Sequence, residues 1–342
     1  MKVLVLGGTR FLGRHLVAAL LARHHEVTLF NRGRSGPGLF DGVAQIEQVQ
    51  GDRADGEAAF AALAGRRWDA VIDTCGYVPR LVRAACSALR SAVDTYVFVS
   101  SISVYADFSA PDLTEDAPLA TLDDPASEDT AAHYGALKAA CEREVQAAFG
   151  SRAFLVRPGL IVGPFDPTGR FTYWPQRVAA GGEILAPGAP ADPLQFIDAR
   201  DLAEWIVRAL TRGPGGAYNV TGPGTPLSFG TFLEACLRTL DPTPPAQVTW
   251  CAESFLLAQG VTPWTGLPLW VPASDRGVHA VSIERAVAAG LSFRPLAATL
   301  TDTLAWARSP QFTPPAGAYA NVGLTREREA ALLQAWHATQ RA

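Results

Sequence analysis

The sequence predicts an α/β protein with a doubly wound parallel sheet and a smaller C-terminal lobe of mixed structure. Two observations lead to this fold class. Short apolar runs alternate with helical patterns through the first half of the 342-residue chain, and this alternation stops beyond Pro164. In addition, 48% of the residues are hydrophobic and 18% are charged, which excludes a disordered, collagen-like or coiled-coil chain.

Five short apolar runs, each bounded by polar or turn residues, are expected to form the first strands: 3–6, 27–30, 46–49, 70–73 and 96–99. The segments with a helical pattern between them are 11–23, 57–63 and 81–89. A longer helix is expected over 131–149, and 154–156 opens the next strand. Strands and helices that alternate at this spacing predict a parallel sheet covered on both faces.

The second half of the chain has a less regular pattern. Proline and glycine are frequent over 164–193, strand and helix return over 194–210, and a strand is expected at 217–220. The sequence after this strand is mixed and rich in proline. A last helix is expected over 325–338, because a threonine can cap it and Leu332, Leu333 and Trp336 share one face.

Charge and cysteine usage narrow the classes of function. The net charge of −4 provides no positive field for a phosphate backbone, so a small-molecule ligand is expected and nucleic acid is not. The five cysteines lie far apart and form no C-x-x-C pair, which indicates a reducing, cytoplasmic compartment. The first apolar run is too short for a signal peptide, and proline and glycine break the uncharged stretch 254–274, so no membrane helix is expected.

A glycine-rich turn, Gly7-Gly8-Thr9-Arg10-Phe11-Leu12-Gly13, lies between the first strand and the first helix. This is the position of a dinucleotide-binding fingerprint, in which the helix N-terminus faces a pyrophosphate. Arg10 stands where the pattern has a glycine, and would supply charge in place of space. A P-loop is not expected, because Arg14 and His15 follow in place of Lys and Ser/Thr.

The turn therefore predicts a Rossmann-type sheet and a division of the chain by function. Residues 1–165, completed by 194–222, are expected to form the dinucleotide-binding domain. Residues 166–193 and 223–342 are expected to form the substrate lobe and the C-terminal helix.

The end of the second predicted strand bears on the choice of cofactor. An acidic residue here binds a ribose 2′-hydroxyl, whereas an arginine accommodates a 2′-phosphate. This chain has Asn31 and Arg32, which favours NADP, with NAD as the alternative. Asp52 and Arg53 follow the third strand and are expected beside the adenine.

Lysine is scarce in this chain. Of the 29 Lys and Arg residues only Lys2 and Lys138 are lysines. The retained Lys138 is therefore a candidate for chemistry that arginine cannot perform, and chance is the alternative explanation. Tyr134 and Lys138 form a Y-x-x-x-K motif in a helical segment and therefore share one face.

Upstream of this motif, the strand that ends at Val99 runs into Ser100-Ser101-Ile102-Ser103. With the glycine turn, these motifs resemble the short-chain dehydrogenase/reductase superfamily, of the extended or atypical type that includes NAD-dependent epimerase/dehydratase-like proteins. The resemblance also includes 157–164 and 195–202, and extends to the strand at 217–220.

The resemblance implies an NAD(P)-dependent oxidoreductase that transfers a hydride at a carbonyl or carbinol. Tyr134 is then the acid/base, Lys138 stabilises its anion and holds the nicotinamide ribose, and Ser101 hydrogen-bonds the substrate oxygen, with Ser100 and Ser103 as alternatives. The chemistry is consistent with these roles, because a phenol with a pKa near ~10 acts as a base at neutral pH only beside a cation.

The cofactor-binding residues expected from topology and resemblance are Gly7, Gly8, Thr9, Arg10, Phe11, Leu12, Gly13, Asn31, Arg32, Asp52, Arg53, Thr74, Cys75, Gly76, Tyr134, Lys138, Pro158 and Gly159. The expected substrate-binding residues are Tyr77, Ser103, Phe165, Arg170, Trp174 and Gln195. No metal site is expected, because the chain has no H-E-x-x-H motif and its six histidines show no ligand spacing.

Departures from the family pattern narrow the reaction. Ile102 and Ser103 stand where sugar-nucleotide 4,6-dehydratases have an Asp-Glu pair, so that dehydration is not expected. Leu160 replaces an asparagine that binds the substrate diphosphate in many extended members. A sugar-nucleotide epimerase with tightly bound NAD remains an alternative. The G-G-x-x-x-x-G turn also resembles an atypical subgroup that includes stem-loop RNA-binding proteins, so a cofactor-binding scaffold or RNA-binding protein is the alternative of another class.

A homodimer is also expected from the resemblance. Extended members of the superfamily pack the Tyr-Lys helix and its neighbour, here 131–149 and 81–89, into a four-helix bundle. Leu137, Cys141 and Val145 follow an i, i+4 line that suits either this interface or packing on the sheet.

Overall fold

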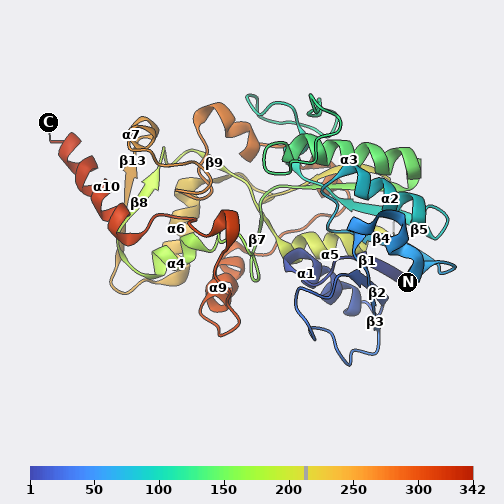
Figure 1. Cartoon of the computed structure of the whole chain (residues 1–342). Helices are drawn as coiled ribbons and strands as arrows, with labels where there is room; N and C mark the ends of the chain where they lie inside the picture. The colour runs from blue at the N-terminus through green and yellow to red at the C-terminus, as the bar shows by residue number, and fades with distance from the viewer. Residues whose placement is uncertain (212–214, 342) are drawn as a thin grey trace. The chain divides into compact units, whose positions relative to one another are not determined.

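The computed structural model describes residues 1–211 and 215–341, and the chain divides into two compact units (Figure 1). Unit 1 comprises Met1–Ile161, Ala199–Gly222 and Val281–Ser292, and unit 2 comprises Val162–Asp198, Pro223–Ala280 and Phe293–Ala342. The predicted domain ranges differ from this division chiefly at 281–292, which belong to unit 1. Residues 212–214, in the predicted dinucleotide-binding domain, and residue 342, in the predicted substrate lobe, lie outside the described residues.

Unit 1 is a Rossmann-type α/β unit with a seven-stranded sheet in the order β11-β6-β5-β4-β1-β2-β3. Its strands are β1 (Lys2–Leu6), β2 (Glu26–Asn31), β3 (Ile46–Gln50), β4 (Trp68–Asp73), β5 (Val93–Val99), β6 (Ala153–Pro158) and β11 (Gly216–Val220). All six neighbouring pairs are parallel. The strand order reverses at β1 and β4, and ligands bind at the carboxyl ends of the strands at such a switch point.

Helices cover both faces of this sheet (Figure 1). The helical elements of unit 1 are α1 (Phe11–Leu21), η1 (Arg53–Leu63), α2 (Pro79–Leu89), η2 (Ile102–Val104), α3 (Tyr134–Phe149), η3 (Gly150–Arg152), α5 (Ala199–Leu210) and α8 (Glu284–Ala288). Helices α2 and α3 pack on one face, over a core that includes Val71, Tyr96 and Phe98. Helices α1 and α5 pack against each other on the opposite face.

The strands and most helices of unit 1 agree with the sequence prediction. The central strands β1, β2, β4, β5 and β6 are largely buried and form apolar runs, whereas the edge strand β3 is largely exposed. Two elements differ. The helix predicted over 57–63 is a 3-10 element that starts at Arg53 and is interrupted at Gly56, where φ is 66°. The helix predicted over 131–149 begins at Tyr134, so the acid/base candidate is its first residue.

Unit 2 contains more regular structure than its sequence predicted. Its strands are β8 (Gly182–Pro187), parallel to β13 (Ala246–Cys251), and β9 (Pro193–Leu194), antiparallel to β12 (Leu227–Ser228). Strand β10 (Ile197–Asp198) pairs with β7 (Ile161–Val162), whose first residue belongs to unit 1. Its helical elements are α4 (Tyr173–Ala179), α6 (Phe229–Leu240), α7 (Glu253–Ala258), η4 (Ala273–His279), α9 (Leu296–Ala307), η5 (Gly317–Tyr319) and α10 (Arg326–Thr339).

Helix α10 is the one element of unit 2 that the sequence predicted with its cap. The Thr325 side chain accepts a hydrogen bond from the backbone N–H of Arg328 at 3.2 Å. Leu332 and Leu333 are buried, and Trp336 is half-buried. Among the described residues, no helix is both long enough and apolar enough to span a membrane.

Candidate active site

The glycine turn after β1 has a conformation that requires glycine. Gly7 and Gly8 have φ of 104° and 88°, in the left-handed region. A Cβ on Gly7 would lie 2.5 Å from Oγ1 of Thr74, and a Cβ on Gly13 would lie 2.7 Å from Cα of Gly8. The turn therefore exposes backbone where side chains would fill the space, and this fits the approach of a pyrophosphate to the N-terminus of α1.

The end of β2 is joined to this turn by Asn31. Its Nδ2 donates to the carbonyl oxygen of Gly7 at 3.1 Å, and its Oδ1 accepts the N–H of Gly33 at 2.8 Å. Arg32 and Arg34 each lie 4.0 Å from Oδ2 of Asp52, and both arginine side chains are largely exposed. The structure thus brings Asn31, Arg32 and Asp52 together beside the glycine turn.

Arg53 points away from the position that the sequence suggested. Its guanidinium forms two hydrogen bonds with the buried carboxylate of Asp73, at 2.8 and 3.0 Å, in place of an exposed position beside an adenine. Nη1 also lies 3.4 Å from Sγ of Cys75, and Nη2 donates to the carbonyl oxygen of Leu81 at 3.3 Å. The sequence did not indicate this inward orientation, because Asp73 lies 20 residues further along the chain.

Asp73, at the carboxyl end of β4, is a site residue that sequence reasoning missed. Its carboxylate also accepts the hydroxyl of Tyr96 at 2.9 Å and the N–H of Cys75 at 3.1 Å. Burial alone would raise the pKa of Asp73, but the charge and hydrogen bonds of Arg53 hold it below its ordinary value. Burial raises the pKa of the Cys75 thiol, so Cys75 is poorly suited to act as a nucleophile.

Ser101 follows β5 and caps the 3-10 turn η2. Its Oγ accepts the backbone N–H of Ser103 at 3.0 Å and lies 3.0 Å from Oγ of Ser103. Ser100 is buried, and its Oγ has no hydrogen-bond partner in the described part of the chain. The serine segment therefore presents a linked pair of hydroxyls, Ser101 and Ser103, at the carboxyl end of the sheet.

Helix α3 starts directly against this serine segment. A Cβ on Gly135 would lie 2.0 Å from the carbonyl oxygen of Ser103, so only glycine permits this approach. Tyr134 precedes this glycine and is 37% exposed. The close contact brings the first turn of α3, with the Tyr134 phenol, beside the residues that carry the Ser101 hydroxyl.

Lys138 lies one helical turn further along α3 and is only 2% exposed. Its Nζ donates to the carbonyl oxygens of Gly76 and Val99, both at 2.7 Å, and lies 4.1 Å from the centre of the Phe98 ring. Burial lowers the pKa of Lys138 to about 8. An ammonium group has three N–H donors, so one remains for a ligand hydroxyl such as that of a ribose.

A buried ion pair holds the same helix to β6. Glu142, one turn after Lys138, accepts hydrogen bonds from Nη2 and Nε of Arg157 at 2.7 and 3.0 Å. Arg157 also donates to the hydroxyl of Tyr105 at 3.2 Å. Pro158 and Gly159 follow at the end of β6, where a Cβ on Gly159 would lie 2.3 Å from Oγ1 of Thr221. The position of α3 is thus fixed at both its first turn, by Gly135, and its third turn, by Glu142.

Residues 3–221 match the sequence pattern of the NAD dependent epimerase/dehydratase family. The chain belongs to this family. It is therefore a member of the extended short-chain dehydrogenase/reductase superfamily, in agreement with the motifs of the glycine turn and of α3.

Curated relatives and a solved structure extend this result. The chain is 33% identical to a 2-alkyl-3-oxoalkanoate reductase of Stenotrophomonas maltophilia over 70% of this chain and 76% of that protein. It is 29% identical to the chloroplast stem-loop binding protein of 41 kDa b of Arabidopsis thaliana, over 69% of this chain and 62% of that protein. A putative epimerase from Burkholderia cenocepacia, 20% identical over 89% of this chain and 97% of that chain, has the same fold with a TM-score of 0.66.

In this epimerase/dehydratase-family protein, two predicted substrate residues lie in unit 1. Tyr77 is 47% exposed and Ser103 is half-buried. Nζ of Lys138 lies 5.3 Å from the centre of the Tyr77 ring. Desolvation, followed by the neighbouring phenol of Tyr134, raises the pKa of Tyr77. The structure therefore brings Tyr77 together with the predicted acid/base pair.

The other predicted substrate residues lie in unit 2. Arg170 lies beside two aromatic rings, 5.8 Å from the centre of Trp264 and 5.4 Å from that of Tyr319. The Phe165 ring lies 5.8 Å from that of Trp306, and the backbone N–H of Gln195 donates to Nδ1 of His279.

Trp174 has no exposed surface in unit 2. Its Nε1 donates to the carbonyl oxygen of Pro268 at 2.8 Å. Because Trp174 is fully buried and its indole N–H is already hydrogen-bonded, we leave it out of the proposed substrate site. Trp264 and Tyr319, which the sequence did not single out, are the aromatic residues beside Arg170.

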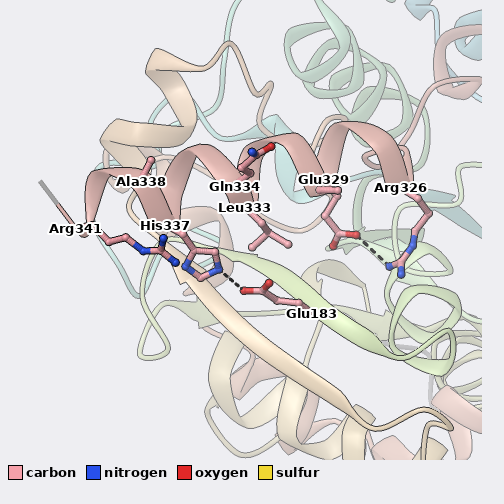
Figure 2. Close-up of a pocket in the computed structure, with 9 residues that line it drawn as sticks. Glu183, Arg326, Glu329, Leu333, Gln334, His337, Ala338 and Arg341 are labelled. Carbon is pink, nitrogen blue, oxygen red and sulfur yellow. Dashed lines mark hydrogen bonds and ion pairs between the residues drawn. The ribbon is translucent and has the colours of Figure 1, made fainter.

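A separate pocket of about 730 Å³ lies along α10 in unit 2 (Figure 2). His337 and Glu183 pair across it at 2.7 Å, and Arg326 pairs with Glu329 at 3.1 Å. None of the predicted site residues lines this pocket. Both carboxylates that line it, Glu183 and Glu329, are paired with basic side chains, so we do not place the active site there.

The apolar line on α3 is not an interface. Leu137, Cys141 and Val145 have no exposed surface within a single chain, because they pack on the sheet side of the helix. The exposed side of α2 and α3 carries an Arg83–Glu144 ion pair instead. These residues therefore do not supply the apolar face that the predicted four-helix dimer needs.

Among the described residues, no three His, Cys, Asp or Glu side chains form a group suited to a metal ion.

Proposed function

We propose that this protein is an NAD(P)-dependent oxidoreductase that transfers a hydride at a carbonyl or carbinol, with Tyr134 as the acid/base. One observation carries the proposal. Lys138 is held in the protein interior by two backbone carbonyls, one helical turn from an exposed Tyr134, and retains one N–H donor. A buried ammonium without an acidic partner at hydrogen-bond distance is costly for folding, which supports a functional reason for it.

In the reductive direction, Tyr134 donates its phenolic proton to the substrate oxygen. When bound, the reduced nicotinamide supplies the hydride to the carbonyl carbon. The Ser101 hydroxyl donates a hydrogen bond to the same oxygen and stabilises the charge that develops on it. Lys138 stabilises the phenolate that remains after the proton transfer, because its ammonium is a fixed cation one helical turn away. In the oxidative direction the same phenolate accepts the proton.

We propose NADP as the preferred cofactor, with NAD as the alternative. Arg32 and Arg34 present two exposed guanidinium groups at the end of β2, against the single carboxylate of Asp52. The net positive charge suits a 2′-phosphate, and Asn31 supplies no carboxylate to repel it. Asn31 is instead used to join β2 to the glycine turn.

On the substrate side, we propose that Tyr77 and Ser103 contact the substrate within unit 1. Within unit 2, we propose Arg170 as a residue that binds an anionic group. Nε of Arg170 donates to Oγ1 of Thr168 at 3.2 Å, which leaves the two terminal amino groups to bind an anionic group. The similarity to a reductase of 3-oxoalkanoates suggests a ketone that carries a carboxylate as the first substrate class to examine.

A cofactor and substrate screen tests this proposal. The purified protein is denatured and any released nucleotide is identified by mass spectrometry. NADPH oxidation is then followed with a panel of ketones that includes 3-oxoalkanoates, with Tyr134→Phe as the control. Turnover that depends on Tyr134 supports the reductase. Tightly retained NAD with no net turnover supports the epimerase alternative, and salt-dependent RNA binding without any turnover supports the RNA-binding alternative.

A further inference from the structure

The Arg53–Asp73 ion pair lies beneath the proposed active site rather than on its surface. Asp73 has no exposed surface, and the Arg53 side chain is 12% exposed. Both oxygens of the carboxylate are engaged by the two terminal nitrogens of the guanidinium. A bidentate pair of this kind fixes orientation as well as distance, because the planar fork matches the carboxylate.

Hydrogen bonds and close packing connect the Arg53–Asp73 ion pair to the loop that holds Lys138. The Asp73 carboxylate accepts the backbone N–H of Cys75, two residues further along. Gly76 follows, packed so closely that a Cβ there would lie 2.5 Å from Phe98 and 3.0 Å from Oδ2 of Asp73. The carbonyl oxygen of Gly76 then receives Nζ of Lys138 at 2.7 Å. Contacts therefore run without a gap from Arg53 to the lysine.

We infer that Arg53 is a positioning residue for Lys138: its ion pair with Asp73 fixes the loop whose Gly76 carbonyl holds the lysine. The catalytic consequence rests on the proposed function, whereas the effect on Lys138 itself does not. The charges around the ammonium are consistent with this role. After burial, which lowers the pKa of Lys138, the nearby Cys141, Asp73 and Glu142 raise it and Arg53 lowers it.

The scarcity of lysine makes the inference directly measurable. Lys138 and Lys2 are the only two lysines in the sequence, and the Lys2 side chain is 64% exposed. Protein labelled with ¹³C-lysine therefore gives two sets of side-chain signals, one of which is a built-in reference. The pH midpoint of each ε-carbon is read by NMR on the cofactor-free protein, so the readout is independent of activity.

The decisive variant is Arg53→Met, with Arg67→Met as the matched control. Arg67 belongs to the same unit, and its side chain is 76% exposed. In Arg53→Met we expect the pH midpoint of Lys138 to rise above its wild-type value, because Arg53 no longer lowers it and the Asp73 carboxylate loses its counter-charge. In Arg67→Met the midpoint of Lys138 stays in place. An unchanged Lys138 midpoint in folded Arg53→Met would overturn the inference.

Activity and loop exchange complete the test. With the substrate found in the screen, we expect kcat of Arg53→Met to fall on the order of 10²-fold, the scale of a displaced catalytic group. A moved NMR midpoint without any loss of turnover would overturn the catalytic role of Lys138 and leave the positioning of Lys138 intact. If Arg53→Met does not fold, Arg53→Gln/Asp73→Asn removes both charges together. Faster hydrogen exchange at the Cys75 amide is then expected, and unchanged exchange would contradict the inference.

Discussion

A Cβ atom on Gly135 would lie 2.0 Å from the carbonyl oxygen of Ser103, so helix α3 begins in direct contact with the serine segment. This contact is what places the first turn of α3 beside the hydroxyl of Ser101. No side chain larger than hydrogen fits there without movement of the helix or of the segment. Packing therefore requires glycine at position 135 of the Y-G-x-x-K motif, independently of the chemistry of Tyr134 and Lys138.

We predict that Gly135→Ala destabilises the protein by about 1–3 kcal/mol, the range for overpacking of a close-packed site, despite the better helix propensity of alanine. Turnover should fall together with stability, because Tyr134 moves away from Ser101. Urea unfolding and kcat of the variant measure the two effects. Ala140→Gly, at a half-buried position on the same helix, is the control for a change of propensity alone. Wild-type stability of Gly135→Ala would contradict the observed contact.

Tyr134→Phe tests the proposed acid/base. The substitution removes only the hydroxyl and leaves the ring at the start of α3, so we expect kcat to fall by ~10²–10⁴ with little change in NADPH binding. Steady-state kinetics and a fluorescence titration of the cofactor separate these effects. A kcat within a factor of about two of wild type would remove Tyr134 from the proton transfer.

Cofactor preference should respond to both charges at the end of β2. Arg32→Ala is expected to narrow the preference for NADPH over NADH by about 1 kcal/mol, a modest value because the side chain is 55% exposed and lies beside Asp52. Asp52→Asn should widen the preference, because it removes the negative charge and can still accept the N–H of Ala54. Dissociation constants for both cofactors measure the change. Preferential binding of NADH by the wild-type protein would contradict the NADP assignment.

The sequence predicted unit 1 well because its evidence is local. Parallel strands buried on both faces form apolar runs, and the glycine turn and the Tyr-Lys helix have fixed spacings. The direction of the Arg53 side chain could not be predicted in this way, because its partner Asp73 lies 20 residues away, at the end of β4. The same limit applies to Leu137, Cys141 and Val145. Their spacing shows that they share a buried face of the helix, but not whether the sheet or a second chain covers that face.

Unit 2 was harder to predict because its elements are stabilised by distant partners. Strand β13 pairs with β8, which lies far away in the sequence and is flanked by proline and glycine. The start of helix α6 does have a local signal in the sequence, because Ser228 and Thr231 cap each other's backbone N–H groups. The two predicted substrate residues Arg170 and Trp174 differ for the same reason. Arg170 lies beside aromatic rings from two remote segments, whereas Trp174 belongs to the core.

His279 should make unit 2 sensitive to acid. Its Nδ1 accepts the N–H of Gln195, so Nε2 carries the proton and donates to Leu269 at 2.9 Å. Burial lowers its pKa from 6.5 to about 4. Between these values the unfolded state binds more protons, so acid favours unfolding and the free energy of unfolding falls by up to about 3 kcal/mol as the pH drops from 6.5 to 4.

The comparison of wild type with His279→Gln measures this effect. Urea unfolding of both proteins at neutral and acidic pH gives the difference in their free energies of unfolding. We expect that difference to favour the wild type at neutral pH and to shrink as the pH falls, because only the wild type loses stability through this group. A difference that is independent of pH would show that His279 does not titrate in this way.

The last prediction concerns Lys138→Arg. Nζ is buried, donates to two carbonyls at 2.7 Å, and faces the Phe98 ring, so a compact ammonium fits there and a planar guanidinium does not. We expect kcat of Lys138→Arg to fall on the order of 10²-fold, nearly as far as that of Lys138→Met, with weaker cofactor binding in both.

The pH profile distinguishes the role of Lys138 from a simple loss of packing. In the wild type, reductive turnover should decline above about pH 8, where Lys138 loses its proton. The part of this decline that comes from deprotonation of Lys138 should be absent in Lys138→Arg, whose guanidinium stays charged. In the oxidative direction Lys138→Met should need a higher pH to form the Tyr134 phenolate, because the nearest fixed cation is gone. Full activity of Lys138→Arg with the wild-type profile would contradict the role of Lys138 and leave Tyr134 and Lys138 as an incidental pair on one helix.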